Sequence, residues 1–545
     1  MQRKAVKKSL GSIGSYAILS WGNAINFSSL GIFGVVVSAT WRKHRKLLQN
    51  HQLGGCLRLR MLAMQAAGRC ACAIAIAALV GGCREHVPEG PGPRAPTTSA
   101  TSILMIVIDT LRADRVAAYG GAPEHMPALA RWAEQAAVFR EAVSVAPFTM
   151  PAVAALMTGA YPDRSGIFIH ASGVTLHDFA GQTLAELARG AGLRTGAVVS
   201  NPWLARPATG FDRGFEHYAA HRDDEPVSLR GANARSVTDS ALRILDGFGS
   251  SPFFLWVHYF DPHMPYRPPA EHAAAAGAAS TDSRVMRDFS ADDRDLTRIY
   301  SGADYAPADV AQAMRLYEGE LRYVDEQLAR LLARLDSSGR SDETLVVIVS
   351  DHGEAMGEHG LFFAHDYTVY DELVRAVLMM RGPGVPSGHR HDLASPIDVV
   401  PTLCRMMGWT CGGDLDGVDL FDPSEDRTGR TLFAAATPFR RRAAAFPRLQ
   451  VKGVDGRWTM ARRGRHKLIK IPQRRRTSAY ELYDLSADPA ELNNLYEGRR
   501  DALQADLAAA LDAWETSMAE TRPAARRARP DPQDEETLRS LGYLQ

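Results

Sequence analysis

The sequence predicts an α/β sandwich with a mainly parallel central sheet, followed by a small C-terminal subdomain of antiparallel strands and a helix. Three observations lead to this prediction. Short apolar, β-branched runs recur along the chain, helical stretches separate them, and beyond about residue 430 the runs become shorter and arginine becomes more frequent. Strands that alternate with helices usually form a parallel sheet, whose ligand site gathers at the carboxyl ends of the strands.

The central strands are expected where four apolar runs occur, because continuous runs of this length are typical of strands buried on both faces. These runs are 103–109, Ala197–Ser200, Phe253–Tyr259 and Leu345–Asp351, and helical patterns lie between them at Gln182–Ala191 and Ala311–Leu335. Two of the runs end in an acid. Asp109 and Asp351 are therefore expected at the edge of the sheet where ligands bind.

The C-terminal subdomain is expected to hold a small sheet followed by a helix. Three short apolar runs predict the strands, at Trp458–Ala461, Lys467–Ile471 and Tyr480–Asp484. The helix is expected from about Ala490 to Glu520. Together with the N-terminal features described below, these elements divide the chain into an N-terminal extension with an export signal (1–82), a flexible tether (83–102), a catalytic domain (103–430) and a C-terminal subdomain (431–545).

Composition excludes several classes of protein. The chain has 545 residues, of which 46% are hydrophobic and 23% charged, so collagenous, coiled-coil and wholly disordered chains are excluded. The net charge of +1 provides no overall field that would attract nucleic acid. Arginine is clustered at 440–442, 474–476 and 526–529, and we interpret these clusters as solvated surface, with no nucleic-acid partner.

A segment near the N-terminus has the composition of an export signal. Arg69 is followed by the apolar run Ala71–Val80 and then by Gly81, Gly82 and Cys83. This segment resembles a bacterial lipoprotein signal, which implies a lipid on Cys83 and a place in the cell envelope, on the periplasmic side of a bacterial membrane. An ordinary cleaved signal or a short anchor is the alternative.

The residues before this signal are interpreted as an over-extended start. The uncharged stretch Ser9–Trp41 is long enough to span a membrane, but polar residues interrupt it, and Met61 or Met64 would put the signal at a normal distance from the start. Beyond Cys83 the chain has two cysteines, Cys404 and Cys411. They exclude a cysteine zinc cluster but allow one disulfide in an oxidising compartment.

Asp109 and the adjacent pair Asp351-His352 are candidate metal ligands. A divalent cation that activates an oxygen nucleophile needs several hard ligands that converge from separate strand ends, and carboxylates and imidazole are the usual ones. An Asp that ends a strand can equally cap the next helix, so the individual residues do not decide between the two roles.

Longer motifs resemble sulfatases of the alkaline-phosphatase-like superfamily. The runs VIDTLRADRVAAYGG from Val107 and VSDHGEAMGEHGLF from Val349 are similar to the two metal-binding strands of that family. Five further runs follow in the family's order, beginning at Phe254, Leu316, Val369, Pro396 and Tyr480. The resemblance covers 103–545 and implies an alkaline-phosphatase-like sandwich.

The nucleophile segment departs from the family pattern. Sulfatases carry Cys or Ser in C-x-P-x-R or S-x-P-x-R and oxidise it to formylglycine, whereas Thr149 stands in that place here and Val153 stands in place of the Arg. No formylglycine is therefore expected. A helix cap is the structural alternative for Thr149.

Threonine in this place resembles the phosphoethanolamine and phosphoglycerol transferases. That resemblance implies one divalent metal ion held by Asp109, Thr149, Asp351 and His352. Thr110 replaces a second Asp of many sulfatases, and His352 replaces an Asn. Both changes favour Zn or Mn over Ca, because oxygen ligands are lost and a nitrogen ligand is gained.

Two further histidines are catalytic candidates because of the motifs around them. His263, in DPHMP, is expected to contact the transferred group or to protonate the leaving oxygen, and His365 stands where relatives have a basic residue near the substrate. A surface or core histidine is the alternative for each. His359 and Arg112 are expected to be structural braces.

The sequence therefore predicts a sulfatase-family, metal-dependent hydrolase of sulfate or phosphate esters that uses Thr149 as its metal-activated nucleophile, with His263 and His365 in catalysis. The expected substrate is a small-molecule, glycan or lipid ester. Two alternatives stay open: a transferase of phosphoryl groups such as phosphoethanolamine, and an inactive, lipid-anchored binding protein. The second is suggested by Ala152 and Val153, which remove polar groups from the nucleophile motif.

Overall fold

The computed structural model describes residues 98–523, with gaps at 169–173, 206–208, 221–232, 292–295, 303–304, 413–414, 425–426, 438–455, 473–477 and 498–500. The predicted signal, Cys83 and the three arginine clusters lie outside the described residues. Within the described part, none of the helices has both the length and the apolar character needed to span a membrane.

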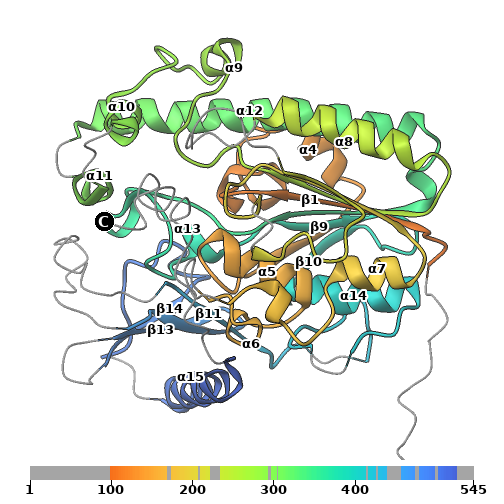
Figure 1. The fold of residues 1–545 in the computed structure, drawn as a ribbon. Coiled ribbons are helices and arrows are strands. Elements are labelled where there is room, and N and C mark those ends of the chain that lie inside the picture. The colour runs from red at the N-terminus through yellow and green to blue at the C-terminus, as the bar shows by residue number, and fades with distance from the viewer. Residues whose placement is uncertain are drawn as a thin grey trace, which may run out of the picture. The chain divides into compact units, whose positions relative to one another are not determined.

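A sheet forms the centre of the described part (Figure 1). It has eight strands in the order β10-β2-β9-β6-β1-β5-β3-β4. Strand β9 pairs antiparallel with β6 and with β2, and the other neighbouring strands are parallel. The bounds are β1 Ser102–Ile108, β2 Ala137–Ala142, β3 Arg194–Val199, β4 His217–Ala220, β5 Phe253–Tyr259, β6 Thr344–Ser350, β9 Leu378–Arg381 and β10 Gly388–Ala394. The predicted mainly parallel sheet is confirmed.

Strands β1, β5 and β6 are buried along their whole length, as expected for strands that are covered on both faces. Their register aligns the carboxyl ends, because Ile108 lies beside both Tyr259 and Ser350. The residues that follow these three strands therefore emerge at one edge of the sheet. This alignment brings Asp351 next to Asp109. The backbone N–H of Thr110, the residue after Asp109, donates to Asp351 Oδ1 at 3.2 Å although 241 positions separate the two residues in the chain.

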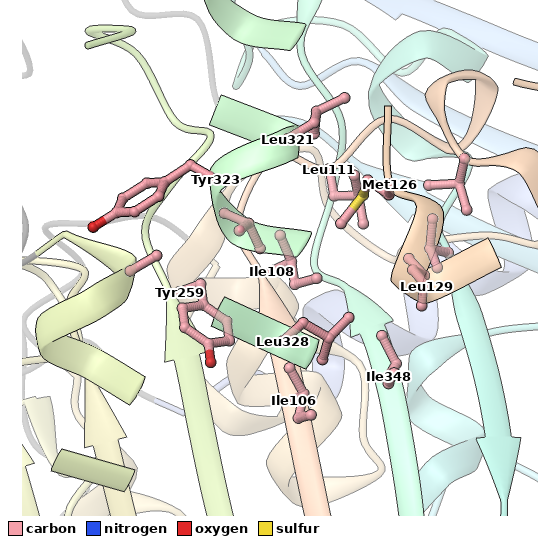
Figure 2. Packing of buried hydrophobic residues seen from close by; sticks show 14 of the residues in the cluster. Ile106, Ile108, Leu111, Met126, Leu129, Tyr259, Leu321, Tyr323, Leu328 and Ile348 are labelled. Atoms are coloured by element: carbon pink, nitrogen blue, oxygen red, sulfur yellow. The ribbon is translucent and has the colours of Figure 1, made fainter. Parts of the chain in front are cut away.

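One face of the sheet packs against the helices α4 (Pro127–Ala133), α8 (Ala234–Phe248) and α12 (Pro307–Ser337). Figure 2 shows Ile106 and Ile108 of β1 beside Leu328 of α12 and Ile348 of β6. Alternate residues of β1, such as Met105, point to the opposite face, because successive side chains of a strand alternate. That face packs against α5 (Thr149–Thr158), α7 (Leu184–Gly190) and α14 (Val399–Met407).

The C-terminal subdomain contains a four-stranded antiparallel sheet in the order β11-β12-β13-β14, and α15 packs on it (Figure 1). The elements are β11 Thr431–Ala435, β12 Thr459–Arg463, β13 His466–Pro472, β14 Ser478–Asp484 and α15 Ala502–Thr521. The three strands expected here are present.

The start expected for the last helix, near Ala490, is wrong. The Asn494 side chain accepts hydrogen bonds from the backbone N–H groups of Leu482 and Tyr496, and it holds this segment as a turn. Helix α15 begins after Asp501 instead, because the Asp501 carboxylate accepts from Gln504 N at 3.0 Å and caps the helix.

Short elements complete the described part. Near the carboxyl edge of the central sheet are the hairpin β7 (Ala355–Met356) and β8 (Phe362–Ala364), the turn η6 (Glu358–Gly360) and α13 (Asp371–Val374). The others are α6 Pro162–Ser165, α9 Ala270–Ala275, α10 Arg284–Ser290, α11 Leu296–Ser301, η1 Ala113–Arg115, η2 Ala117–Tyr119, η3 Leu176–Asp178, η5 Ser341–Glu343 and η7 Pro396–Asp398. A disulfide joins Cys404 to Cys411.

Candidate active site

Polar residues from four neighbouring strands meet at the carboxyl edge of the central sheet. Asp109 follows β1, Asn201 follows β3, His258 is the penultimate residue of β5, and Asp351 and His352 follow β6. All five side chains are almost completely buried. Ligand sites in α/β proteins form at this edge because the strand ends open towards loops that can diverge around a ligand.

Thr149 is brought to the same place by the start of α5. It is the first helical residue, and the cap position belongs to Phe148, so the side chain does not serve as the helix cap that was the alternative for it. Its Oγ1 lies 3.5 Å from both carboxylate oxygens of Asp109 and 3.4 Å from Nε2 of His352. Asn201 Nδ2 lies 3.3 Å from the same hydroxyl. The four residues predicted as metal ligands are thus brought together.

The two carboxylates are held close together away from water. Burial raises the pKa of Asp109 well above its usual value, and the nearby charge of Asp351 adds to this effect, although Asn201 Nδ2 donates to Asp109 Oδ2 at 2.7 Å. Burial also raises the pKa of Asp351, to about 7. Asp351 Oδ1 accepts from the backbone N–H of Thr110 and of His352, but Oδ2 has no hydrogen-bond partner.

His352 presents a lone pair to these carboxylates. Its Nδ1 lies 2.8 Å from the carbonyl oxygen of Gly353, so Nδ1 carries the proton and Nε2 does not. Nε2 lies 3.7 Å from Asp109 Oδ1 and 3.5 Å from Asp351 Oδ2. A carbonyl that fixes the tautomer in this way is the usual arrangement behind a metal-bound histidine.

His258 belongs to this site although no sequence motif pointed to it. It is fully buried, its Nε2 lies 3.9 Å from Asp109 Oδ2, and neither ring nitrogen has a hydrogen-bond partner. Burial lowers its pKa to about 3, so the ring is neutral. The available signal was a histidine in an otherwise apolar strand, one place before the strand end. Asn201 was missed too, because an Asn after a strand is common in ordinary turns.

The chemistry of these donors fits a divalent cation. Asp109, His258 and Asp351 each offer one ligand atom, and these atoms lie within 4.8 Å of one another. Buried polar atoms without partners are costly, and here Asp351 Oδ2 and one ring nitrogen of His258 would be satisfied by a cation between the side chains. Mixed oxygen and nitrogen donors suit Zn or Mn.

The two catalytic candidates, His263 and His365, lie beside this group. The ring of His365 is 4.6 Å from that of His352 and 4.9 Å from that of His263, measured between centroids. His263 stacks on Phe260 and its Nδ1 lies 2.6 Å from the Met264 carbonyl oxygen. The three rings form a continuous row that starts at the carboxylates.

Glu354 controls the charge of His365. Its Oε1 lies 2.9 Å from His365 Nδ1, and its carboxylate is completely buried. Burial alone would lower the pKa of His365, but the charges of Glu354 and Asp366 raise it to about 9. His365 is therefore a proton donor at neutral pH.

Other residues singled out in the sequence have different environments. Val153 and Ala152 are buried among apolar side chains of the core. Thr110 has a positive φ of 51°, and its hydroxyl has no hydrogen-bond partner. Arg112 pairs with Asp114 and Glu358 and donates to the Glu354 carbonyl, which is the bracing role expected for it.

Comparison with protein families gives two matches. Residues 101–409, more than half of the chain, match the family model described as sulfatase. Residues 357–517 match the model described as N-sulphoglucosamine sulphohydrolase, C-terminal.

Two curated relatives illustrate the range of similarity. A choline-sulfatase from Rhizobium meliloti (strain 1021) is 25% identical over 456 residues, which cover 74% of this chain and 84% of the relative. A multifunctional alkaline phosphatase superfamily protein from Trinickia caryophylli is 27% identical over 240 residues, which cover 39% of this chain and 47% of the relative.

Solved structures share the fold. A structure in complex with its substrate D-glucosamine-2-N,6-O-disulfate has a TM-score of 0.61 and 20% identity, and the match covers 81% of this chain and all of that one (100%). A phosphonate monoester hydrolase of Agrobacterium radiobacter has a TM-score of 0.57 and 21% identity, with 78% and 95% of the two chains covered.

Proposed function

The chain belongs to the sulfatase family of sulfuric ester hydrolases, and we propose that it is a metal-dependent hydrolase of sulfate or phosphate esters in which Thr149 is the nucleophile. One observation carries the proposal. The Thr149 hydroxyl, at the start of α5, lies 3.4–3.5 Å from Asp109 and His352, inside a group of donors suited to a divalent cation.

The residues that would hold the cation are Asp109, Asp351, His352 and Thr149, to which we add His258. Asp351 Oδ2 and the ring nitrogens of His258 are buried without a hydrogen-bond partner. His258 Nε2 lies 3.9 Å from Asp109 Oδ2, which is too long for a hydrogen bond. When bound, a divalent cation lowers the pKa of a neighbouring hydroxyl and stabilises negative charge on the transferred group. We expect Zn or Mn to bind more tightly than Ca because of the nitrogen donors.

The residues of this chain suggest a two-step displacement. Thr149 Oγ1 gives its proton to Asp109, to which it donates at 3.5 Å, and forms a bond to phosphorus or sulfur. The bond to the leaving oxygen breaks, and that oxygen takes a proton from His365 or His263. The backbone N–H groups at the start of α5 favour an anion next to Thr149. Water then attacks the threonine ester, which restores the hydroxyl and releases phosphate or sulfate.

Threonine in the nucleophile position favours phosphorus over sulfur. A formylglycine hydrate has a second hydroxyl that can expel sulfate, whereas a threonine ester must be cleaved from outside. We therefore expect phosphate or phosphonate esters to be turned over faster than sulfate esters. An acceptor alcohol in place of water would make the enzyme a transferase, which is the second candidate because Thr149 is the same nucleophile in both reactions.

The substrate is expected to be a small-molecule, glycan or lipid ester. Relatives act on choline sulfate or glucosamine sulfate according to their names and titles, and a fold neighbour is a phosphonate monoester hydrolase. We further propose that the enzyme is anchored in the bacterial cell envelope through a lipid on Cys83. Labelled fatty acid should attach to Cys83, and Cys83→Ala should leave the membrane fraction; continued attachment would favour the stretch 9–41 as the anchor.

The function is tested with chromogenic esters and a mass spectrum of quenched enzyme. Chelator-treated protein, reloaded with Zn, Mn or Ca, is assayed on a sulfate monoester, a phosphate monoester, a phosphodiester and a phosphonate ester. We expect activity with Zn or Mn and a modified peptide that contains Thr149. Turnover without any modified Thr149 peptide would contradict the nucleophile, and failure of all four ester classes in every metal form would favour a binding protein.

A further inference from the structure

A second group of potential ligands lies where the segment after β7 meets the C-terminal subdomain, and one of its three members is buried while the other two are partly buried. His359 belongs to η6, Glu372 to α13, and Glu491 to the loop after β14. One ligand atom from each side chain lies within 4.8 Å of the other two. We refer to these three residues as the junction cluster.

We propose that the junction cluster binds a second divalent cation, Zn or Mn, that is separate from the catalytic one. Imidazole and carboxylate are usual ligands of these metals, and water can take the remaining position. Bond lengths near 2 Å would require the ligand atoms to move closer by roughly 1 Å, and rotation of the Glu372 side chain can provide this because Lys467 holds Glu491 in place.

Glu372 is the residue that points to a missing ligand. Its side chain is only 8% exposed, its Oε1 has no hydrogen-bond partner, and its Oε2 lies 3.9 Å from His359 Nε2, which is too long for a hydrogen bond. A carboxyl group that stayed protonated would donate its proton to an acceptor, and a carboxylate would need a cation. Oε1 shows no such acceptor, so the geometry favours the cation.

The two neighbouring cationic side chains, Lys467 and Arg462, pair with acids other than Glu372. Lys467 is fully buried, and its Nζ lies 2.8 Å from both Asp371 Oδ1 and Glu491 Oε1. Arg462 pairs with Glu141 and lies 3.9 Å from Asp371. None of these cations is therefore left to pair with Glu372. Without a cation, burial and the charge of Glu491 raise the pKa of Glu372 to about 8, so binding of a metal would displace a proton from this carboxyl group.

The neutral ring of His359 offers a nitrogen lone pair to a cation. Burial and the nearby charge of Lys467 lower its pKa to about 4, so the ring is neutral and keeps one lone pair. Its ring stacks on Tyr370 with a centroid distance of 3.5 Å and an angle of 6°, which fixes its orientation towards the cluster. From the sequence, His359 was expected to have only a bracing role. A bound cation would make that brace stronger, because it would tie the segment between Asp351 and His365 to the C-terminal subdomain.

The experiment counts metal in the full chain. Parent protein, Glu372→Gln, Asp351→Asn and the double variant are saturated with Zn²⁺, freed of excess metal by gel filtration, and analysed by mass spectrometry for zinc per chain. We expect two equivalents in the parent, one in each single variant, and none in the double variant. In Asp351→Asn, where only the junction cluster remains, Zn²⁺ should raise the melting temperature, and adding Glu372→Gln should weaken zinc binding at least tenfold.

Matched variants make the result interpretable. Glu481→Gln removes a nearby carboxylate that accepts from Tyr370 OH and Tyr483 OH, and it should keep both equivalents. His359→Gln repeats the test should Glu372→Gln fail to fold. Full zinc binding in Asp351→Asn carrying Glu372→Gln or His359→Gln would overturn the junction site, as would a parent that binds one equivalent and loses it all in Asp351→Asn. If the parent lacks only the zinc equivalent that depends on Asp351, the result contradicts the proposed catalytic metal site and still supports the junction cluster.

Discussion

Two regions of the molecule bury carboxylates, and they compensate the charge in different ways. At the edge of the central sheet, Asp109 and Asp351 face each other, and burial raises the pKa of both. Asp163 of α6 is also fully buried, but it lies between Arg457 and Arg522. Burial alone would raise the pKa of Asp163, yet the two guanidinium groups hold it below its usual value.

This difference distinguishes a buried acid that is available to bind a ligand from a buried acid that stabilises the fold. Asp163 accepts from Arg457 Nη1 at 2.6 Å and from Nη2 at 3.0 Å, so its charge is satisfied within the protein. Asp351 leaves Oδ2 without a partner. A folded protein tolerates such an atom where a ligand completes it, and buried acids with raised pKa values are common at functional sites for this reason.

The largest expected effect concerns Thr149. Thr149→Ala removes the hydroxyl and should lower kcat/KM on the best ester by a factor on the order of 10³ or more, whereas Thr149→Ser should keep measurable activity because it keeps the hydroxyl. Steady-state kinetics of the two variants with equal metal content check this. Equal rates for Thr149→Ala and the parent would remove Thr149 from the mechanism.

The next largest effect is on stability and concerns Asp163, which lies between the two arginines. Asp163→Asn keeps the shape but removes the charge between the two arginines, and it should lower the free energy of unfolding by about 3 kcal/mol, at the low end for a broken buried pair because Arg522 is 34% exposed. Urea denaturation measures the loss. Specific activity of the folded fraction should stay within a factor of about two, and a large drop in activity without a drop in stability would reverse the assignment of the two regions.

The two regions should also depend on pH with opposite signs in chelator-treated protein. The folded-state pKa of Asp351 is raised to about 7, so between about pH 4 and 7 the folded chain holds a proton that the unfolded chain has lost, and the contribution of Asp351 to stability falls as pH rises. The folded-state pKa of Asp163 is lowered. Its contribution is therefore present above about pH 4 and is lost as the pH falls further.

Melting temperatures between pH 3 and 8 test these signs, for the parent, Asp351→Asn and Asp163→Asn. Relative to the parent, Asp351→Asn should become more favourable as the pH rises, while the deficit of Asp163→Asn should shrink below about pH 4. Parallel curves for the two variants would show that the regions are not compensated differently.

The smallest effect is expected for His258. His258→Phe removes two buried nitrogens that have no partner in the metal-free protein, so it should leave the stability of chelator-treated protein unchanged or raise it by about 1 kcal/mol. In contrast, it should weaken Zn²⁺ binding about tenfold, because the ring offers one of the ligand atoms. Calorimetric titration with Zn²⁺ and thermal unfolding provide the two measurements, and unchanged zinc affinity would exclude His258 from the site.

Local patterns were sufficient to predict the layered fold. Continuous apolar runs predicted β1, β5 and β6 within one residue at either end, because a strand buried on both faces has no polar positions to obscure its limits. The helix cap that was the alternative for Thr149 is one residue away, because Phe148 occupies the cap position and Thr149 is the first helical residue. The early start expected for α15 failed because hydrogen bonds of Asn494 with residues on both sides compete with the helix, and a hydrophobic pattern does not contain such bonds.

Tertiary structure decided which polar residues share a site. Asp109, Thr149 and Asp351 could be grouped from motifs, but His258 and Asn201 joined them only when parallel pairing placed β5 and β3 next to β1. The junction cluster depends even more on the fold, because His359 and Glu491 come from segments that are far apart in the chain and are brought together by the C-terminal sheet. Sequence patterns carry short-range periodicity, whereas burial and the lack of a partner arise from long-range packing, and it is these that turn a polar residue into a ligand.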